Sequence, residues 1–478
     1  MTYKLNRNSH YKPWALSNFN CLLLIFICSL LSACNDSSNT DEQNKSTNSS
    51  KTTTARGFFG DMQSSDTFTS VERNTYVELP EDHKSHPDFQ LEWWYLTFVL
   101  SGENGQEFGL QYTLFRFNTD KAPDKSTARP VVRNWANVQQ WMGHASLHTL
   151  NHHYFEERFA SGGVGNAYVK PQPFTTVIDD WVWKATRRKA ETEAQVDSQA
   201  MFPSMLTFAF GQRHTRDTNQ PSNVTSKPSE GELPRKDGSQ NDAVDRASPA
   251  DTQLNNEVAR RNNAVKVALS LDSTGPFIKQ GNNGYSKKAQ DEKLRSYYYS
   301  QPFINAKGTI NIEGNNIKVD GKGWFDHEWT SHLANSEALG WDWFSLHLSD
   351  GSKLMAFRMH SHTDSKAESE SQNAEIFTTA SFITKNGMKE TVEQADVTIT
   401  PTGYELIQKG SKQGGEHRSA ARSVPTSWRI QLPTKNIDVS VSAFKEKQWN
   451  ESLFPYYEGR VEVEGSHSGN GFMELTGY

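Results

Sequence analysis

The sequence predicts an all-β protein of many short strands, arranged as barrels or sandwiches. Residues 91–100 and 108–117 are rich in aromatic and β-branched side chains and are separated by the turn-forming hexapeptide Ser-Gly-Glu-Asn-Gly-Gln. Apolar residues in the second run, such as Phe108, Leu110 and Tyr112, recur with the period of two that is typical of strands. Long amphipathic stretches with a helical period are scarce. These observations together favour antiparallel β structure.

The same pattern recurs along the rest of the chain. It predicts further strands at residues 175–183, 205–210, 265–269, 297–299, 309–319, 340–348, 353–359, 375–383, 397–399, 428–432 and 471–475. The tetrapeptide Glu-Trp-Trp-Tyr at 92–95 opens one hairpin, and Trp-Asp-Trp-Phe at 341–344 opens another. This echo suggests two similar units.

Composition locates the ordered part of the chain. The 478 residues exceed one ordinary domain, and 13 Trp provide core material despite a mean hydropathy of -0.74. Residues 35–56 predict a disordered tether, because their polar stretch 35–54 has no aromatic residue; the equally aromatic-free residues 211–264 predict a disordered insertion. The formal net charge of -6, of mixed sign, gives no basic footprint, so nucleic acid is not an expected partner.

The N-terminus predicts export and lipid anchoring. Lys4 and Arg7 precede an apolar run at 21–31, which ends in Leu-Ser-Ala before Cys34, as in a secretory signal of residues 1–34. The run of about 11 residues is short of the ~20 that span a membrane. The end of the signal resembles the bacterial lipobox, in which the thiol corresponding to Cys34 is acylated. We therefore expect a membrane-anchored lipoprotein of the bacterial cell envelope, facing the periplasm or the exterior.

The cysteine content limits the possible chemistry. All three cysteines, Cys21, Cys28 and Cys34, lie within the signal, so the mature chain offers no free thiol. Disulfides, thiolate catalysis and cysteine-ligated zinc are therefore excluded. The sequence also has no glycine-rich phosphate loop and no Gly-x-Ser-x-Gly elbow, which argues against NTPases and α/β-hydrolases.

Two clusters combine carboxylates with aromatic residues. On a strand, Glu92 shares an apolar face with Trp94, so it is either a paired structural group or a candidate acid. In the second cluster, Asp326 and Glu328 would share one strand face and His327 the other. The alternatives for this cluster are a catalytic site and a hydrogen-bond network that pins a barrel end. It is not a helical zinc motif, because His327 and His332 are five residues apart.

Two further clusters are candidate binding features. Trp341 and Trp343 lie on one face of a predicted strand, either as core or as the lining of a barrel interior that holds a long apolar ligand. Histidines also gather at 144–153, without a carboxylate at a ligand spacing. Solvated or hydrogen-bonded strand histidines are therefore favoured over a metal site. We expect neither a metal nor a cofactor.

Several motifs, in order, resemble the AttH-like, lipocalin-like family that includes carotenoid 1,2-hydratase (hydroxyneurosporene synthase). The matching segments are His86-Pro87-Asp88-Phe89, Glu92-Trp93-Trp94-Tyr95, Tyr297-Tyr298-Tyr299-Ser300, Trp324-Phe325-Asp326-His327-Glu328-Trp329, Gly340-Trp341-Asp342-Trp343-Phe344-Ser345-Leu346, Tyr457-Glu458-Gly459 and Met473-Glu474-Leu475-Thr476-Gly477-Tyr478. The resemblance implies two consecutive lipocalin-like (calycin) antiparallel β-barrels, at residues 57–300 and 301–478. Envelope members of this kind are often labelled only as predicted secreted hydrolases.

The resemblance also implies an activity, the cofactor-free, acid-catalysed hydration or hydrolysis of an apolar polyene or lipid. Asp326 would be the proton donor, and His327 or Glu328 would orient it or the water. The implied substrate-binding residues are Glu92, Trp94, Tyr298, Trp324, Trp341 and Trp343, some of which would stabilise a cation through their ring faces. The alternative is a non-catalytic lipid carrier, or an accessory protein of an envelope ABC-type exporter.

Overall fold

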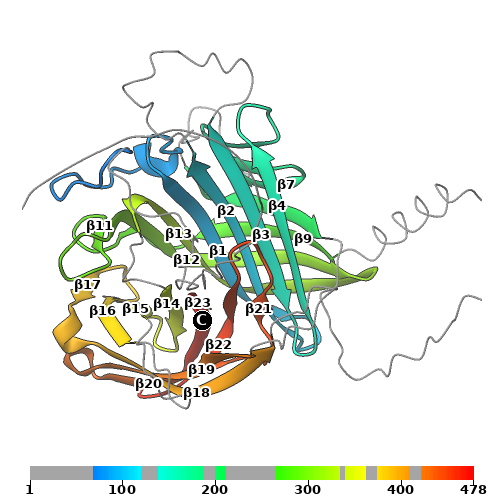
Figure 1. Cartoon of the computed structure of the whole chain (residues 1–478). Coiled ribbons are helices and arrows are strands. Elements are labelled where there is room, and N and C mark those ends of the chain that lie inside the picture. Colours follow the sequence, from blue (N-terminus) through cyan, green and yellow to red (C-terminus); the bar gives the residue numbers. More distant parts are fainter. Residues whose placement is uncertain are drawn as a thin grey trace, which may run out of the picture. The chain divides into compact units, whose positions relative to one another are not determined.

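The computed structural model describes residues 68–119, 138–186, 200–210, 265–333, 340–361, 374–408 and 421–478 (Figure 1). Their regular structure is β-strand apart from three short 3₁₀ turns, η1 (Glu81–His83), η3 (Gln394–Asp396) and η4 (Pro433–Lys435). In this described part no helix is long and apolar enough to cross a membrane. The predicted signal peptide with Cys34, the tether at 35–56 and the insertion at 211–264 lie outside the described residues.

The first sheet is a meander whose first and last strands are neighbours. Its strands are β1 (Leu91–Gly102), β2 (Glu107–Asn118), β3 (Gln139–His148), β4 (His153–Ser161), β5 (Ala167–Pro171), β6 (Phe174–Ile178), β7 (Trp181–Ala185), β8 (Ser204–Phe210), β9 (Val265–Ser273), β12 (Arg295–Ile312) and β13 (Asn315–His332), with β10 (Ile278–Lys279) and β11 (Tyr285–Lys287) paired to β12. Their order is β4-β3-β2-β1-β13-β12-β9-β8-β7-β6-β5, antiparallel throughout. The sheet curls, and this brings β4 into contact with β6 and β8 near the other end of the strand order.

The second sheet repeats this scheme. Its strands are β14 (Gly340–Leu348), β15 (Lys353–Ser361), β16 (Ala374–Ile383), β17 (Lys389–Val392), β18 (Thr398–Gln408), β19 (Ala421–Leu432), β20 (Ile437–Ala443), β22 (Tyr456–Gly465) and β23 (Gly469–Leu475), with β21 (Trp449–Asn450) paired to β22. Their order is β17-β16-β15-β14-β23-β22-β20-β19-β18, so the first strand again lies beside the last. The prediction of an all-β fold with two lipocalin-like barrels is confirmed.

The predicted boundary between the two barrels at residues 300 and 301 is wrong. It falls inside β12, which pairs with β9 on one side and with β13 on the other. β13 in turn pairs with β1, so the hairpin of β12 and β13 closes the first sheet. The first sheet therefore ends at His332 and the second begins at Gly340.

Alternating side chains divide each sheet between two cores. On β1, Trp94, Leu96 and Phe98 point into the core of the first sheet, whereas Phe344 on β14 belongs to the core of the second. A third cluster joins the opposite faces of both sheets. It includes Tyr95, Val99, Tyr298 and Trp324 from the first sheet and Trp343, Met355, Phe357 and Phe472 from the second. The face of the first sheet that its own core does not use is thus covered by the second sheet.

The core of the second sheet provides a test of this packing. Phe344 is fully buried, and its ring packs edge to face on Trp428 with centroids 5.3 Å apart. We expect Phe344→Ala to lower the free energy of unfolding by about 3–5 kcal/mol, because it leaves a cavity. Urea denaturation followed by tryptophan fluorescence measures this change. Leu406→Ala, at a side chain 73% exposed, is the control and should have almost no effect; equal losses in both would contradict the assigned core.

Candidate active site

Strand register places Asp326 and Glu328 of β13 on its outward face. Asp326 lies opposite Tyr95 of β1 and Ser300 of β12, and Glu328 lies opposite Tyr298. Because residues two apart on a strand share a face, and directly paired residues do too, these five side chains lie on one side of the sheet. That side is the one that meets the second sheet.

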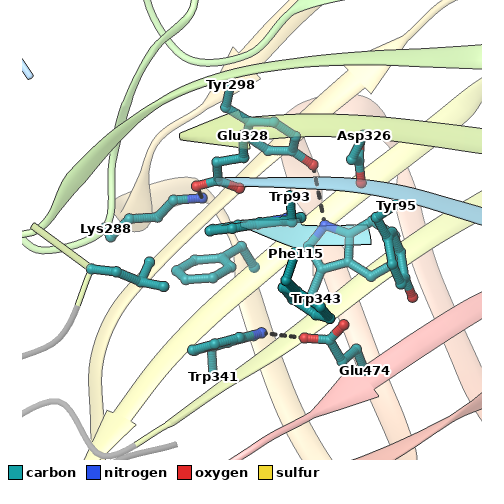
Figure 2. Close-up of a pocket in the computed structure, with 12 residues that line it drawn as sticks. Trp93, Tyr95, Phe115, Lys288, Tyr298, Asp326, Glu328, Trp341, Trp343 and Glu474 are labelled. Atoms are coloured by element: carbon teal, nitrogen blue, oxygen red, sulfur yellow. Dashed lines mark hydrogen bonds and ion pairs between the residues drawn. The ribbon is translucent and has the colours of Figure 1, made fainter. Parts of the chain in front are cut away.

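A cavity lies where this face meets β14, β15 and β23 (Figure 2). It is lined by Trp93, Tyr95, Phe115, Lys288, Tyr298, Asp326, Glu328, Leu333, Trp341, Trp343, Phe357 and Glu474. Its volume is about 40 Å³. A single water needs roughly 10–15 Å³ of such space, so the cavity accommodates a few waters. The walls are mainly aromatic, with a small number of ionisable groups.

Asp326 is the acid of this cavity. Asp326 is 3% exposed, and its Oδ1 accepts hydrogen bonds from the Ser300 hydroxyl and, at 2.8 Å, from Trp324 Nε1. Burial raises the pKa of Asp326, the two donors lower it in part, and the resulting value is about 7. A carboxylic acid in this state can hold a proton at neutral pH and still release it.

A second carboxyl group enters the cavity from the other sheet. Glu474 of β23 accepts a hydrogen bond of 2.8 Å from Trp341 Nε1, as Figure 2 shows. Burial, with contributions from the charges of Asp326 and Glu328, raises the pKa of Glu474 to about 7. The cavity therefore contains two carboxyl groups that can exchange protons near neutral pH.

Glu328 has a different environment from Asp326. Lys288 Nζ lies 2.9 Å from Glu328 Oε1 and 4.7 and 4.6 Å from the ring centres of Tyr298 and Phe357. Lys288 is 4% exposed, so this ion pair is buried in the cavity wall. The pair places a cation among aromatic rings, which contrasts with the uncharged donors around Asp326.

His327 lies on the opposite face of β13, inside the first sheet. Its Nε2 is 2.9 Å from Glu92 Oε1, its Nδ1 is 3.0 Å from the Tyr299 hydroxyl, and its ring stacks on Trp94. His327 therefore does not contact Asp326, because the backbone of β13 separates the two side chains. Of the two residues expected to orient the acid or the water, Glu328 is the one on the same face as Asp326. Glu92 and Trp94, expected to bind substrate, also point into this interior and do not line the cavity.

Glu92 is the centre of a buried hydrogen-bond network at this end of the first sheet. Its carboxylate accepts from Arg116 Nε at 2.7 Å and contacts His86 Nδ1 at 2.7 Å. Burial opposes ionisation of Glu92, but Arg116 and His86 outweigh it, and the pKa of Glu92 lies well below its usual range. For Glu92 and His327, this arrangement fits the structural alternative that the sequence left open.

The same network contains the ligand atoms for a possible cation. His86 Nδ1, Glu92 Oε1 and His327 Nε2 lie within 4.8 Å of one another and could hold a divalent metal. In this structure His86 Nδ1 and His327 Nε2 each hydrogen-bond to Glu92 Oε1, and Arg116 provides positive charge beside Glu92. The donors and charges of the network are thus matched by the protein's own groups.

The histidines of β3 and β4 are buried. His144 Nδ1 lies 2.9 Å from the Tyr456 hydroxyl and His144 Nε2 lies 3.1 Å from Glu157. His148 packs edge to face on His153, with ring centroids 4.5 Å apart. For His144 this fits the interpretation as a hydrogen-bonded strand histidine.

The predicted aromatic residues divide between the cavity and its support. Tyr298, Trp341 and Trp343 line the cavity, and Trp343 Nε1 donates to the Tyr298 hydroxyl at 3.2 Å. Trp324 is fully buried beside Asp326 and holds it through its indole N–H. One expectation from the sequence is a cavity inside a barrel. The cavity lies instead between the two sheets, because Trp341 and Trp343 point away from the core of their own sheet.

Sequence reasoning missed seven of the twelve residues that line the cavity. The missed residues are Trp93, Tyr95, Phe115, Lys288, Leu333, Phe357 and Glu474. The sequence did carry a signal for three of these residues. Period-two alternation puts Trp93 and Tyr95 on the face of the strand that Trp94 does not occupy, and Glu474 interrupts the apolar run Phe-Met-Glu-Leu at 472–475. Lys288 and Phe357 carry no local signal of this kind.

The sequence of this chain matches a known protein family. The AttH-like family model matches residues 70–227 and 203–478, most of the chain. The chain belongs to the AttH-like family. No curated protein sequence matches this AttH-like protein.

A solved structure shares the fold of this AttH-like protein, and a second is included for comparison only. A Nitrosomonas europaea protein, provisionally described as AttH, is 23% identical over 86% of this chain and 100% of its own, with a TM-score of 0.58. Kievitone hydratase from Nectria haematococca is 13% identical over 87% of this chain and 98% of its own, with a TM-score of 0.47. The first of these likenesses establishes the common fold.

The pairing of Glu92 with Arg116 gives a stability prediction. Arg116→Leu leaves a fully buried carboxylate without its cation, so we expect the free energy of unfolding to fall by about 3–5 kcal/mol at pH 7. Since the folded pKa of Glu92 is depressed, its contribution is present above the unfolded value of about 4.3 and is lost as pH falls through the folded pKa. The difference between variant and unmodified protein should therefore shrink in acid.

Urea denaturation at pH 7 and at pH 3 measures both effects of Arg116→Leu. The control is Arg429→Leu, which removes an exposed pair with Asp438 and should change stability little. If Arg116→Leu were as mild as the control, Glu92 would not depend on its buried partner.

Proposed function

We propose that this AttH-like protein is a cofactor-free hydratase that adds water to a double bond of an apolar polyene or unsaturated lipid. The observation that supports it best is that Asp326, whose pKa is raised to about 7, faces an aromatic cavity. Desolvation is the physical means of keeping a carboxyl group protonated near pH 7. A cavity that served only to hold lipid would gain nothing from this buried acid.

The proposed reaction begins with proton transfer from Asp326 to one carbon of the double bond. The π electrons form the new C–H bond and leave a cation on the other carbon. Tyr298, Trp341 and Trp343 offer ring faces to this cation, each contributing about 2 kcal/mol when desolvated. A water molecule then adds through its oxygen and loses a proton, so that alkene plus water gives an alcohol. General acid catalysis of this kind typically contributes about 10²–10⁴-fold.

The size of the cavity restricts how such a substrate binds. About 40 Å³ accommodates the attacking water but not an isoprenoid end as well. The aromatic side chains must therefore move apart when the reacting end of the substrate enters. A long polyene would place only its terminus at Asp326, and the rest of the molecule would stay outside the cavity.

The other candidate is a non-catalytic lipid carrier, or an accessory to an envelope exporter, favoured by the apolar walls of the cavity. In either case we propose that acylated Cys34 anchors the protein to the cell envelope. An anchor of this kind would keep the cavity close to membrane-borne substrates, since the soluble domain could not diffuse away from the bilayer.

Asp326→Asn separates the enzyme from the carrier. Asn cannot donate the carboxylic proton, so hydration of squalene should fall by about 10²–10⁴-fold while binding, followed by tryptophan fluorescence, is retained. In the unmodified protein the rate should fall as pH rises through about 7, where Asp326 loses its proton. Asp320→Asn, exposed on the same strand, is the matched control. Full turnover in Asp326→Asn would exclude this acid, whereas binding without any turnover in the unmodified protein would support the carrier.

Cys34→Ala tests the anchor. Without the thiol no acyl chain can be attached, so the variant should lose incorporation of radiolabelled palmitate in cells and should fail to remain with the membrane as a mature lipoprotein. Cys28→Ala, in the apolar run of the predicted signal that precedes Cys34, is the control and should still be labelled. Equal labelling of both variants would contradict acylation at Cys34.

A further inference from the structure

We infer that Glu474 is the second catalytic residue of the cavity, the base that takes a proton from the attacking water while Asp326 protonates the substrate. This inference rests on the proposed hydration and adds the group that the second sheet supplies to it. Sequence patterns did not single out Glu474, and its role follows from where the two sheets place their carboxyl groups.

The two carboxyl groups belong to facing walls. Asp326 comes from β13 of the first sheet, and Glu474 comes from β23 of the second, opposite Trp343 of β14 in register. Figure 2 shows Asp326 and Glu474 entering the cavity from different sides, with Trp343 between them. The indole N–H of Trp341 holds Glu474 Oε1, which fixes the carboxyl group in the wall. An alkene bound along Trp343 would thus have one carboxyl group near each side.

Glu474 has a carboxyl partner that does not line the cavity. Glu458 of β22 lies directly opposite Glu474 on the neighbouring strand, so their side chains share a face. Glu458 is fully buried and accepts hydrogen bonds from the Tyr95 hydroxyl and, at 3.4 Å, from Asn450 Nδ2. Two carboxylates this close in a dry environment cannot both be ionised at modest cost.

The two carboxyl groups differ in their pKa values. Burial, then the charge of Glu474, raises the pKa of Glu458 well above its usual range, whereas the pKa of Glu474 is about 7. Burial thus favours the neutral form of Glu458, and Glu474, whose carboxyl group lines the cavity, is the member that ionises near neutral pH. The other ionisable groups that line the cavity with Glu474 are Asp326, Glu328, Lys288, Tyr95 and Tyr298, of which Lys288 lies against Glu328.

The step balances in atoms and charge. Asp326 loses its proton to one carbon of the double bond, and the water oxygen bonds to the other carbon. The displaced water proton passes to the Glu474 carboxylate, which becomes a neutral acid as Asp326 becomes a carboxylate. Exchange with cavity water then returns both groups to their starting states, and no oxidant, reductant or cofactor takes part.

Glu474→Gln and Glu458→Gln form a matched pair of variants for the test. Hydration of squalene in detergent by the full chain is followed by incorporation of ¹⁸O from labelled water. We expect Glu474→Gln to lower kcat by at least about 10²-fold and to abolish the acid limb of the pH profile, which reports the base. Glu458→Gln replaces a neutral acid by a neutral amide that still accepts from Tyr95, so kcat should stay within about threefold and the acid limb should remain.

Different outcomes overturn different parts of this scheme. Failure of the unmodified protein to hydrate squalene contradicts the proposed function and, with it, the role of Glu474. Loss of activity in Asp326→Asn but full activity and an unchanged acid limb in Glu474→Gln overturns the inference alone. Equal losses in Glu474→Gln and Glu458→Gln, with both pH profiles unchanged in shape, show that the pair is structural and also overturn it.

A second measurement avoids the variants, in case Glu474→Gln does not fold. Infrared spectra of the unmodified protein, with glutamate labelled by ¹³C at the side-chain carboxyl, follow individual protonated carboxyl groups as pH changes. We expect one buried glutamic acid to titrate near pH 7, while burial keeps the pKa of a second, Glu458, well above the usual range of glutamate. Absence of a glutamate that titrates between pH 6 and 8 would overturn the assignment of Glu474 as the base.

Discussion

The structure depends on one constraint, that the second half of β13, from Gly323 to His332, carries ionisable residues on both of its faces and both faces are buried there. A buried charge must be paired, or the group must become neutral. The interior face solves this by pairing, since Glu92 binds Arg116 and contacts His327. The outward face uses both solutions, because Lys288 pairs with Glu328 while Asp326 receives only uncharged donors. One strand therefore carries a structural network on one side and a reactive acid on the other.

Strand order explains why the site lies at this place. In each sheet the first and last strands are neighbours, which puts β1 beside β13 and β14 beside β23. The closing pair of the first sheet presents Tyr95 and Asp326, and the closing pair of the second presents Trp343 and Glu474. These four residues all line the cavity, so the site is formed by equivalent parts of the two repeated units. Neither sheet contains both carboxyl groups.

Dryness links the packing of the sheets to the chemistry of the cavity. The aromatic side chains that join the sheets also exclude water from the carboxyl groups, and this exclusion raises the pKa of Asp326 and of Glu474 into the neutral range. A wider opening would let solvent stabilise the carboxylates and would remove the acid. The small volume of the cavity is therefore part of the proposed mechanism, although it requires the walls to move when substrate binds.

The sequence by itself determined the all-β class, the repeat, and the division of Asp326 and Glu328 from His327, because a period of two fixes which side chains share a face of a strand. It could not determine what each face packs against. Pairing between distant strands decided that β12 belongs to the first sheet, that Glu92 and Trp94 are interior, and that Glu474 joins Asp326 in one cavity. Local alternation carries no information about these long-range contacts, so only the tertiary structure could bring together carboxyl groups that are 148 positions apart (474 − 326).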